Sequence, residues 1–221
     1  MKCPRFIATL AVCLAVVGTC NLVRGEAIAI SNFDNNHEGW VGVELPFGTV
    51  VPPYTVLNTA VPEWMSTGGN PTGFIQNSVN IHSTFYWSAP SKFLGDVAHA
   101  YGQSLSFDLF DTEAAGTFDV EDIILIGESR IVVFDLSTDP GPEWASFSVS
   151  LDETGWRSNN LSGPAATQAD MLAVLGDLRS LYIRAEYQLQ IDTRGLDNVI
   201  LMPEPSSLTL LWVAGLWLFL N

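Results

Sequence analysis

The chain has 221 residues, of which 24 are acidic and 9 basic, so its formal net charge at pH 7 is −15. Between Glu26 and Met202 the imbalance is steeper, with 23 acidic residues against six basic ones. A surface of this charge repels nucleic acid and anionic lipid, which excludes nucleic-acid binding as a function. It suits solvation, cation binding and contact with neutral sugars.

Residues 1–25 have the composition of a secretory signal peptide. Lys2 and Arg5 supply a positive start, and an apolar stretch follows from Phe6 to Gly18. That stretch is shorter than the ~20 residues of a membrane-spanning helix, which favours export over the alternative, a permanent N-terminal anchor. All three cysteines lie at positions 3, 13 and 20. The domain expected at residues 26–202 therefore has no disulfide and must depend on its hydrophobic core.

Ten segments with strand composition follow, most of them bounded by Gly, Pro, Asn or Asp. In SLSFDLF (104–110), leucine and phenylalanine occupy alternate positions, which gives the strand one apolar face. Because no helices recur between the strands, the pattern predicts an all-β, antiparallel jelly-roll-like β-sandwich. The longest interruption is the proline-bearing stretch from Pro46 to Pro71, which we expect to be loop. The ten segments are AIAIS (27–31), WVGVEL (40–45), GFIQNSV (73–79), TFYWSA (84–89), SLSFDLF, DIILIG (122–127), RIVVFDL (130–136), WASFSVSL (144–151), LYIRAEYQL (181–189) and LDNVILM (196–202).

One short helix is predicted to flank the sandwich, in TQADMLAVLGDLRS (167–180). Thr167 can cap its first turn, and Asp170 completes a box-like pair with it. The apolar residues recur at helical spacing and indicate a core-facing stripe. They are Met171, Val174, Leu175 and Leu178.

A calcium site is the first chemical hypothesis. FDNNHEG (33–39) resembles the first half of a calcium loop, but Leu45 stands at the twelfth position, where an EF-hand needs an acid. We instead expect Asp34, near the start of the domain, and Asp197, near its end, to converge on one structural calcium. The alternative is a pair of exposed turn acids, with Asp197 capping a strand.

Hydrolysis and sugar binding are two further hypotheses. Carboxylates at Asp108, Asp111, Glu113, Glu121 and Asp122 offer pairs for a carbohydrate-active hydrolase, but any acidic protein offers such pairs. No nucleophile elbow and no zinc-ligand spacing of histidines is present, so we expect a protein that is not an enzyme.

Tryptophans provide the aromatic surface that sugar binding needs. Trp87 and Trp144 lie inside predicted strands and are expected in the core. Trp64 is expected in an exposed loop, as a candidate ligand-binding residue. The alternative for Trp64 is packing over a neighbouring strand.

The tail, residues 203–221, places Pro203, Glu204 and Pro205 directly before an apolar run from Leu208 to Leu220. It resembles the PEP-CTERM sorting signal of Gram-negative bacteria, although the basic cluster that ends such signals is missing. The resemblance implies an exosortase-type processing enzyme as a partner, transient insertion of the tail in the inner membrane as a short transmembrane helix, and delivery to the cell surface or extracellular matrix. A plain tail anchor and a buried last helix are the alternatives.

YWSAPSKFLGDVAHAYGQSLSFDL (86–109) resembles the signature of the laminin IV type A domain, also called laminin B. Further matching motifs are GGNPTGFI (68–75), IILIG (123–127), LAVLGDLRSLYIRAEY (172–187) and GLDNVIL (195–201). The resemblance implies an extracellular β-sandwich without established catalysis, here in a bacterial exported protein. The residues of the signature itself predict a structural role. Phe93 and Leu94 are expected to anchor a turn that connects the sheets, and Lys92 is expected to pair with Asp96 or another carboxylate.

These observations predict a non-catalytic surface or matrix protein that binds extracellular polysaccharide (exopolysaccharide) or another surface protein. The carbohydrate-active hydrolase is the alternative.

Overall fold

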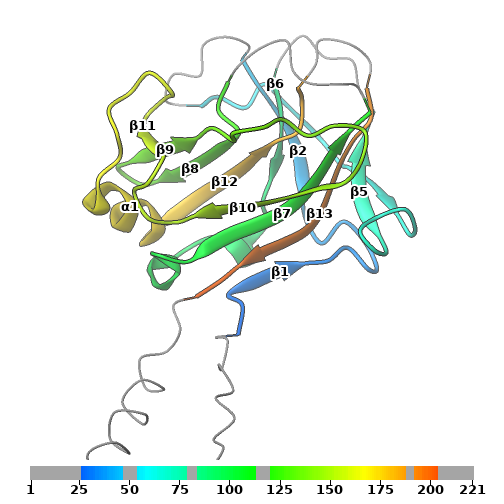
Figure 1. Ribbon diagram of the computed structural model, residues 1–221, viewed down its shortest axis with the longest axis horizontal. Coiled ribbons are helices and arrows are strands. Elements are labelled where there is room, and N and C mark those ends of the chain that lie inside the picture. The colour runs from blue at the N-terminus through cyan, green and yellow to red at the C-terminus, as the bar shows by residue number, and fades with distance from the viewer. Residues whose placement is uncertain (1–25, 47–53, 79–83, 113–119, 188–191, 204–221) are drawn as a thin grey trace, which may run out of the picture.

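The computed structural model describes residues 26–46, 54–78, 84–112, 120–187 and 192–203. Within these ranges the chain forms thirteen strands, one α-helix and two short 3-10 helices. The strands make two antiparallel sheets that face each other, with the helix at one end (Figure 1). The predicted all-β sandwich with one short flanking helix is therefore confirmed. The predicted signal peptide and all of the predicted tail after Pro203 lie outside the described residues.

The two sheets differ in size, and every described pair of strands is antiparallel. The six-stranded sheet runs in the order β10 (Ala145–Ser150), β7 (Ser104–Asp111), β13 (Arg194–Leu201), β5 (Phe74–Asn77) and β4 (Glu63–Met65), with β1 (Ala29–Ser31) also paired to β13. The seven-stranded sheet runs in the order β11 (Arg157–Ser158), β9 (Ile131–Phe134), β8 (Ile123–Gly127), β12 (Leu178–Arg184), β6 (Thr84–Ser88), β2 (Val41–Leu45) and β3 (Asn58–Ala60).

All ten predicted strands are present, and three short ones are additional. β3 and β4 lie inside the stretch from Pro46 to Pro71 that was expected to be loop, so that prediction was wrong for this part. β11 is only two residues long. These strands escape sequence analysis because two or three residues are too few to show an alternating pattern.

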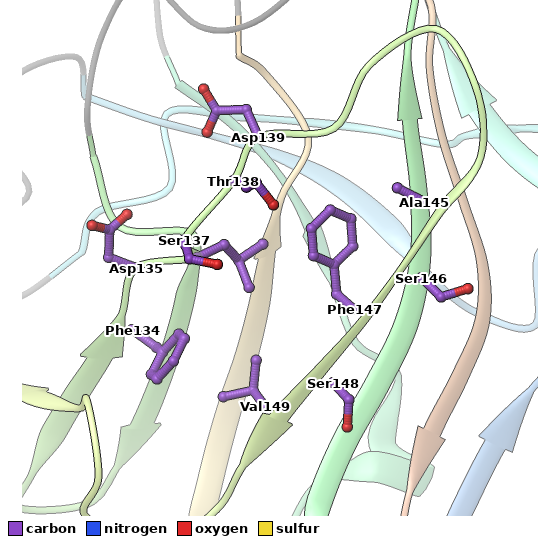
Figure 2. A pocket seen from close by; sticks show the side chains of 11 residues that line it. Phe134, Asp135, Ser137, Thr138, Asp139, Ala145, Ser146, Phe147, Ser148 and Val149 are labelled. Carbon is purple, nitrogen blue, oxygen red and sulfur yellow. The ribbon is translucent and has the colours of Figure 1, made fainter.

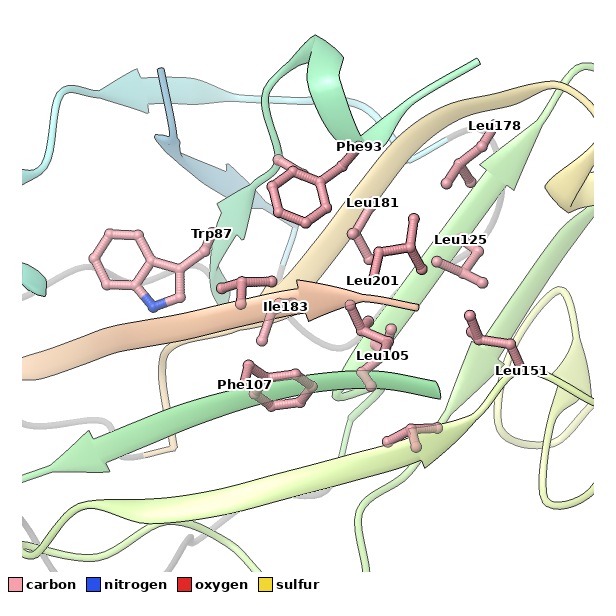
Figure 3. Packing of buried hydrophobic residues seen from close by; sticks show 14 of the residues in the cluster. Trp87, Phe93, Leu105, Phe107, Leu125, Leu151, Leu178, Leu181, Ile183 and Leu201 are labelled. Atoms are coloured by element: carbon pink, nitrogen blue, oxygen red, sulfur yellow. The ribbon is translucent and has the colours of Figure 1, made fainter. Parts of the chain in front are cut away.

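The main core lies between the sheets (Figure 3). Alternation along β7 sends Leu105, Phe107 and Leu109 inward, as predicted, and all three are about 1% exposed. Trp87 of β6 and Ile183 of β12 meet them from the opposite sheet. Fully burying one such side chain contributes roughly 1.5–3 kcal/mol, so a domain without disulfides can rest on this layer.

The seven-stranded sheet is apolar on its outer face as well. A second cluster there includes Val43, Tyr86 and Tyr182. Tyr54 and Leu161, from segments outside the sheet, pack over this cluster, and the Tyr54 hydroxyl donates to the Asn159 carbonyl at 2.7 Å. Side chains of the protein itself therefore occupy this face.

The segment from Ala89 to Gln103 connects the two sheets at one end of the sandwich. It contains η1 (Ser91–Phe93) and η2 (Ala98–Ala100), and Phe93 is completely buried against Trp40, with ring centroids 5.4 Å apart. The Val97 N–H donates to the Leu175 carbonyl at 2.8 Å, which ties the segment to the helix. The predicted structural role of the signature is confirmed.

The helix α1 (Gln168–Leu175) begins as predicted. Thr167 and Asp170 form a reciprocal capping box, and Met171, Val174 and Leu175 are buried. The predicted continuation to Leu178 was wrong, because the helix stops before Gly176 and Leu178 is the first residue of β12. In the described part of the chain, no helix is both long and apolar enough to cross a membrane.

Candidate functional site

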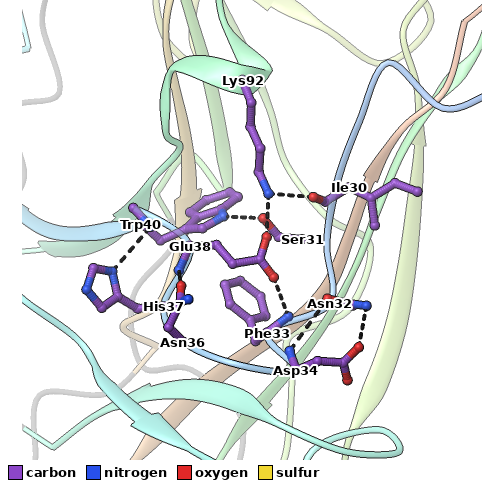
Figure 4. A network of polar contacts seen from close by, with 11 residues as sticks. Ile30, Ser31, Asn32, Phe33, Asp34, Asn36, His37, Glu38, Trp40 and Lys92 are labelled. Atoms are coloured by element: carbon purple, nitrogen blue, oxygen red, sulfur yellow. Dashed lines mark hydrogen bonds and ion pairs between the residues drawn. The ribbon is translucent and has the colours of Figure 1, made fainter.

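A network of polar contacts holds the first loop of the domain against η1 (Figure 4). Lys92 Nζ forms an ion pair with Glu38 and donates to the Ile30 carbonyl at 2.5 Å. The other Glu38 oxygen accepts the Phe33 N–H at 2.7 Å. The partner of Lys92 is thus Glu38 and not Asp96, the acid next to it in sequence, because the loop folds back onto η1.

Trp64 faces inward. It belongs to β4, where it is in register with the buried Ile75, and it packs against the main core. Its indole N–H donates to the Phe33 carbonyl at 2.7 Å. The expectation of an exposed loop position was therefore wrong, and packing over a neighbouring strand describes it better. Ligand binding by the half-buried Trp64 ring stays a prediction.

Asp197 anchors the turn from Gly69 to Thr72. One of its carboxylate oxygens accepts the Asn70 N–H and the other the Asn198 N–H, both at 2.7 Å. Asp108, in register with Asp197 on the neighbouring strand, accepts the amide of Asn198 at 2.7 Å. Burial is the main cause that raises the pKa of Asp197 to about 6, and repulsion from Asp108 and Asp34 adds to it.

Asp34 reaches the same turn from the other side, because its Oδ1 accepts the Thr72 hydroxyl at 2.7 Å. The structure thus brings Asp34 and Asp197 to one turn, as the calcium hypothesis requires. In the described ranges, no group of three or more His, Cys, Asp or Glu side chains is arranged to hold a metal. A calcium site would therefore need backbone or amide oxygens of this turn, and it stays a prediction.

Trp144 lies outside the core, contrary to expectation. It precedes β10 and is half-buried, with its indole N–H donating to the Gly68 carbonyl at 2.9 Å. Its ring meets Phe110 edge-on at a centroid distance of 4.7 Å and Phe74 at 5.3 Å. Phe110 points away from the core residues of β7, so this aromatic cluster covers the outer face of the six-stranded sheet.

The carboxylates considered for hydrolysis are mostly buried. Glu113 lies outside the described residues. The other four are at most 7% exposed: Asp108, Asp111, Glu121 and Asp122. Asp108 binds the turn described above, and Asp122 contacts Arg184 Nη1 at 3.3 Å. Asp108 and Asp122 therefore serve the structure, and all four carboxylates are buried.

A buried charged cluster surrounds Arg184 and Arg194. Arg184 and Asp122 are each 1% exposed in their side chains, and Arg194 contacts Asp192 and, at 3.8 Å, Glu186. Burial, only partly offset by Arg184, raises the pKa of Asp122 to about 7. Burial likewise raises the pKa of Glu186 to about 8, against the opposing effect of Arg194. Burial therefore favours the protonated form of these two carboxyl groups.

A groove of about 490 Å³ opens along one side of the sandwich, between the end of β9 and strand β10 (Figure 2). Its apolar lining comes from Phe134, Leu136, Phe147 and Val149. Its polar lining consists of Asp135, Ser137, Thr138, Asp139, Ser146 and Ser148, all of them exposed. No lysine or arginine lines the groove among the described residues.

The sequence analysis did not predict this groove. The wall formed by β10 was predicted as a strand, and the opposite wall was predicted as a strand only as far as Leu136. Asp135, Asp139 and Phe147 were not singled out as site residues. The only available signal was the alternation of serine with apolar residues from Ala145 to Ser150, which predicts a strand with one polar face. It does not show that the strand lacks a neighbour on one side.

Together, the fold and the groove define a β-sandwich module with a lateral groove. The family profile described as Laminin B (Domain IV) matches residues 86–203, more than half of the chain. The chain therefore belongs to the Laminin B (Domain IV) family.

Individual relatives share the sequence over part of the chain. Human laminin subunit alpha-1 is 32% identical over 110 residues, 47% of this chain and 4% of that protein. Zebrafish laminin subunit gamma-1 is 28% identical over 180 residues, 78% of this chain and 10% of that protein. The mouse basement membrane-specific heparan sulfate proteoglycan core protein is 31% identical over 130 residues, 56% of this chain and 3% of that protein. The chain thus spans a tenth or less of the length of these relatives.

Two solved structures share the fold. The L4b domain of human laminin alpha-2 superposes with a TM-score of 0.55 at 18% identity, covering 66% of this chain and 86% of that one. The solution structure of the carbohydrate-binding module CtCBM11 superposes with a TM-score of 0.51 at 13% identity, covering 83% and 98%. At these identities the likeness concerns the fold alone.

Proposed function

We propose that this protein is a non-catalytic, exported binding module of the cell surface or extracellular matrix, whose ligand occupies the groove between β9 and β10. The observation that carries the proposal is the groove itself, which combines an apolar floor with hydroxyl and carboxylate groups at its rim. Such a mixture is typical of ligand sites. The outer face of the seven-stranded sheet is a poorer candidate, since Tyr54 and Leu161 already cover its apolar cluster.

The ligand is an extracellular polymer, either a polysaccharide or another surface protein. A net charge of −15 disfavours anionic polymers and leaves neutral polysaccharides as the sugar candidates. The fold shared with CtCBM11, whose name denotes carbohydrate binding, supports a sugar ligand by analogy only.

Binding without catalysis is favoured over hydrolysis. Of the five carboxylates considered for hydrolysis, the four described ones are buried. The acids that do line the groove, Asp135 and Asp139, are exposed on one loop segment. Two glycosidase carboxylates must instead flank the scissile bond from opposite sides.

Export and surface attachment follow from the two ends of the chain. Residues 1–25 would direct secretion, and Pro203, Glu204 and Pro205 with the apolar run after them would present the tail to an exosortase-type enzyme at the membrane. Because β1 pairs with β13 and Ala29 is in register with Leu201, the domain begins and ends at one place. Mass spectrometry of the native protein tests this, since intact ends at both positions would contradict it.

One structural calcium, held near Asp34 and Asp197, is the cofactor we propose. Calcium that binds only the folded state raises the melting temperature. Excess chelator should therefore lower the melting temperature of the full-length protein, and Asp197→Asn should remove this response. An identical melting curve with and without chelator would exclude the site.

A polymer screen with a turnover assay tests the proposed function. The full-length protein is incubated with immobilised neutral, acidic and amino polysaccharides and with surface protein extracts, and both bound protein and released sugar are measured. We expect retention without release, and weaker retention for Phe147→Ala. Released sugar that disappears in an Asp135→Asn or Asp139→Asn variant would reverse the proposal in favour of a hydrolase.

A further inference from the structure

Strand β10 is the last strand of its sheet, and its free edge forms one wall of the groove. Among the described strands it pairs only with β7, with Phe147 opposite Phe107 and Val149 opposite Leu105. The six residues of β10 include no proline, no charged residue and no bulge. Natural sheets usually protect an exposed edge with one of these features. β10 is therefore open to pairing with another chain.

The direction of the backbone groups follows from the contacts at the end of β10. The Leu151 N–H donates to the Gln103 carbonyl on the side of β7. The Ser150 carbonyl points the other way and accepts the Trp156 indole N–H at 2.8 Å. Because antiparallel strands alternate in this respect, Ser146 and Ser148 present their N–H and C=O groups to the groove side.

These backbone groups match a second extended chain. Ser146 and Ser148 are two residues apart, about 6.8 Å along a strand, which is the spacing at which the backbone of an added strand presents its own pairing groups. The side chains of Phe147 and Val149 face inward beside Phe134 and Leu136, where alternate apolar side chains of an added strand would lie. The other side chains of the added strand would lie beside the exposed serines.

The negative charge of the groove favours a partner chain with basic residues. Asp135 and Asp139 are exposed at the wall opposite β10. None of the six basic residues in the described ranges lines the groove, and five of them form ion pairs, with Glu38, Asp170, Asp177, Asp122 and Asp192. A second copy of this protein would bring a further charge of −15 and the same acidic wall, so self-pairing is opposed by repulsion.

We infer that β10 binds an extended polypeptide of alternating apolar and basic residues, which adds as a seventh strand to the six-stranded sheet. This inference rests on the proposed binding function and names the partner class for the same groove. Polysaccharide is the less suitable occupant of this edge, because paired N–H and C=O groups at strand spacing fit a peptide backbone.

The test uses three capped octapeptides and the full-length protein in a non-ionic detergent. The first peptide is (Lys-Val)4, the second is (Glu-Val)4, and the third is (Lys-Val)4 with its backbone N-methylated at alternate residues on the pairing edge. Fluorescence anisotropy measures the dissociation constants. We expect (Lys-Val)4 to bind about tenfold tighter than either control, because one control reverses the charge and the other removes the strand hydrogen bonds. Equal binding of the N-methylated peptide would overturn strand addition.

A matched pair of variants locates the binding. Ser148→Pro removes an N–H that points to the groove and not to β7, whereas Ser148→Ala removes only the hydroxyl. We expect Ser148→Pro to weaken (Lys-Val)4 about tenfold and Ser148→Ala to change it less than about twofold. If Ser148→Pro does not fold, hydrogen exchange of the unmodified protein decides: added peptide must slow exchange of the Ser146 and Ser148 amides, and unchanged exchange there would overturn the inference.

The outcomes separate this inference from the proposed function. Polysaccharide retention without binding of any peptide would overturn strand addition and leave the binding module in place. Failure of all polysaccharides, peptides and extracted proteins to bind would remove both.

Discussion

Acidic side chains occupy two contrasting regions of this protein. At one end of the sandwich, Asp122 and Glu186 are buried around Arg184 and Arg194, with side chains about 1% exposed. Along the groove, Asp135 and Asp139 stand in solvent beside β10. The same residue type thus holds the fold together in one place and shapes a candidate ligand site in the other. The comparison teaches that an acidic composition by itself says nothing about catalysis, because burial decides what each carboxylate does.

The largest effect is expected when one partner of the buried ion pair between Arg184 and Asp122 is removed. Arg184→Met should destabilise the domain by about 3–5 kcal/mol, because it leaves Asp122 buried without its cation. Urea denaturation measures the effect. The control is Arg179→Met, whose ion pairs with Glu128 and Asp177 are solvent-exposed and whose loss should barely move the urea midpoint. Equal midpoints for both variants would contradict the structural role of the buried pair.

The buried acids should also make stability depend on pH. The pKa of Asp122 is raised to about 7 and that of Glu186 to about 8, so the folded state binds more protons than the unfolded one between about pH 4.5 and 8. Stability should therefore fall as pH rises through this window, and the melting temperature should be higher at pH 6 than at pH 8.5.

The variant Glu186→Gln separates this effect from the general relief of negative charge. It should reduce the pH dependence of the melting temperature between pH 6 and 8.5, because the proton of Glu186 is gone while that of Asp122 still titrates. The control is Glu143→Gln, which removes an exposed acid that does not act on Asp122 or Glu186 and should leave the slope intact. A slope that is identical in wild type and Glu186→Gln would assign the dependence to other groups.

An intermediate effect on stability is expected for the ion pair between Lys92 and Glu38, whose side chains are partly buried. The side chains of Lys92 and Glu38 are 38% and 20% exposed. Lys92→Met should cost about 1 kcal/mol, since it loses a partly solvated ion pair and one hydrogen bond to the Ile30 carbonyl. A double-mutant cycle with Glu38→Gln measures the pair alone. A coupling energy of zero would mean that Lys92 acts only through its bond to Ile30.

The smallest effect on stability is expected in the groove. Asp139→Asn should leave the urea midpoint unchanged or raise it slightly, because Asp139 repels the buried Asp122 carboxylate. The same variant should weaken binding of a basic peptide. A large loss of stability would show that Asp139 belongs with the structural acids, and the contrast between the two regions would fail.

The strands and the helix start could be predicted from sequence because their signals are local. SLSFDLF alternates over seven positions, and Thr167 with Asp170 forms a capping box within one turn. β3, β4 and β11 could not be predicted, since their two or three residues are held by neighbouring strands. The positions of Trp64 and Trp144 could not be predicted either, because they too depend on neighbouring strands. Trp64 was expected to be exposed, but its register with Ile75 turns it inward. Trp144 was expected in the core, but it lies over Phe110 on the outer face.

The sequence led us to expect that Asp34 and Asp197 converge on a calcium ion, because residues near the start and end of a sandwich meet where β1 pairs with β13; calcium binding there stays a prediction. It could not show that both carboxylates are engaged by the turn from Gly69 to Thr72. Nor could it show that β10 ends its sheet, which creates the groove.

By itself, the sequence determined that residues 26–202, which contain no cysteine, form an acidic β-sandwich of the Laminin B kind, because periodicity, capping and motif order depend on neighbouring residues. Only the tertiary structure decided which carboxylates are buried with arginine and which face solvent, and which strand edge stays unpaired. Those properties depend on contacts between residues far apart in the chain, and a local sequence pattern does not indicate such contacts.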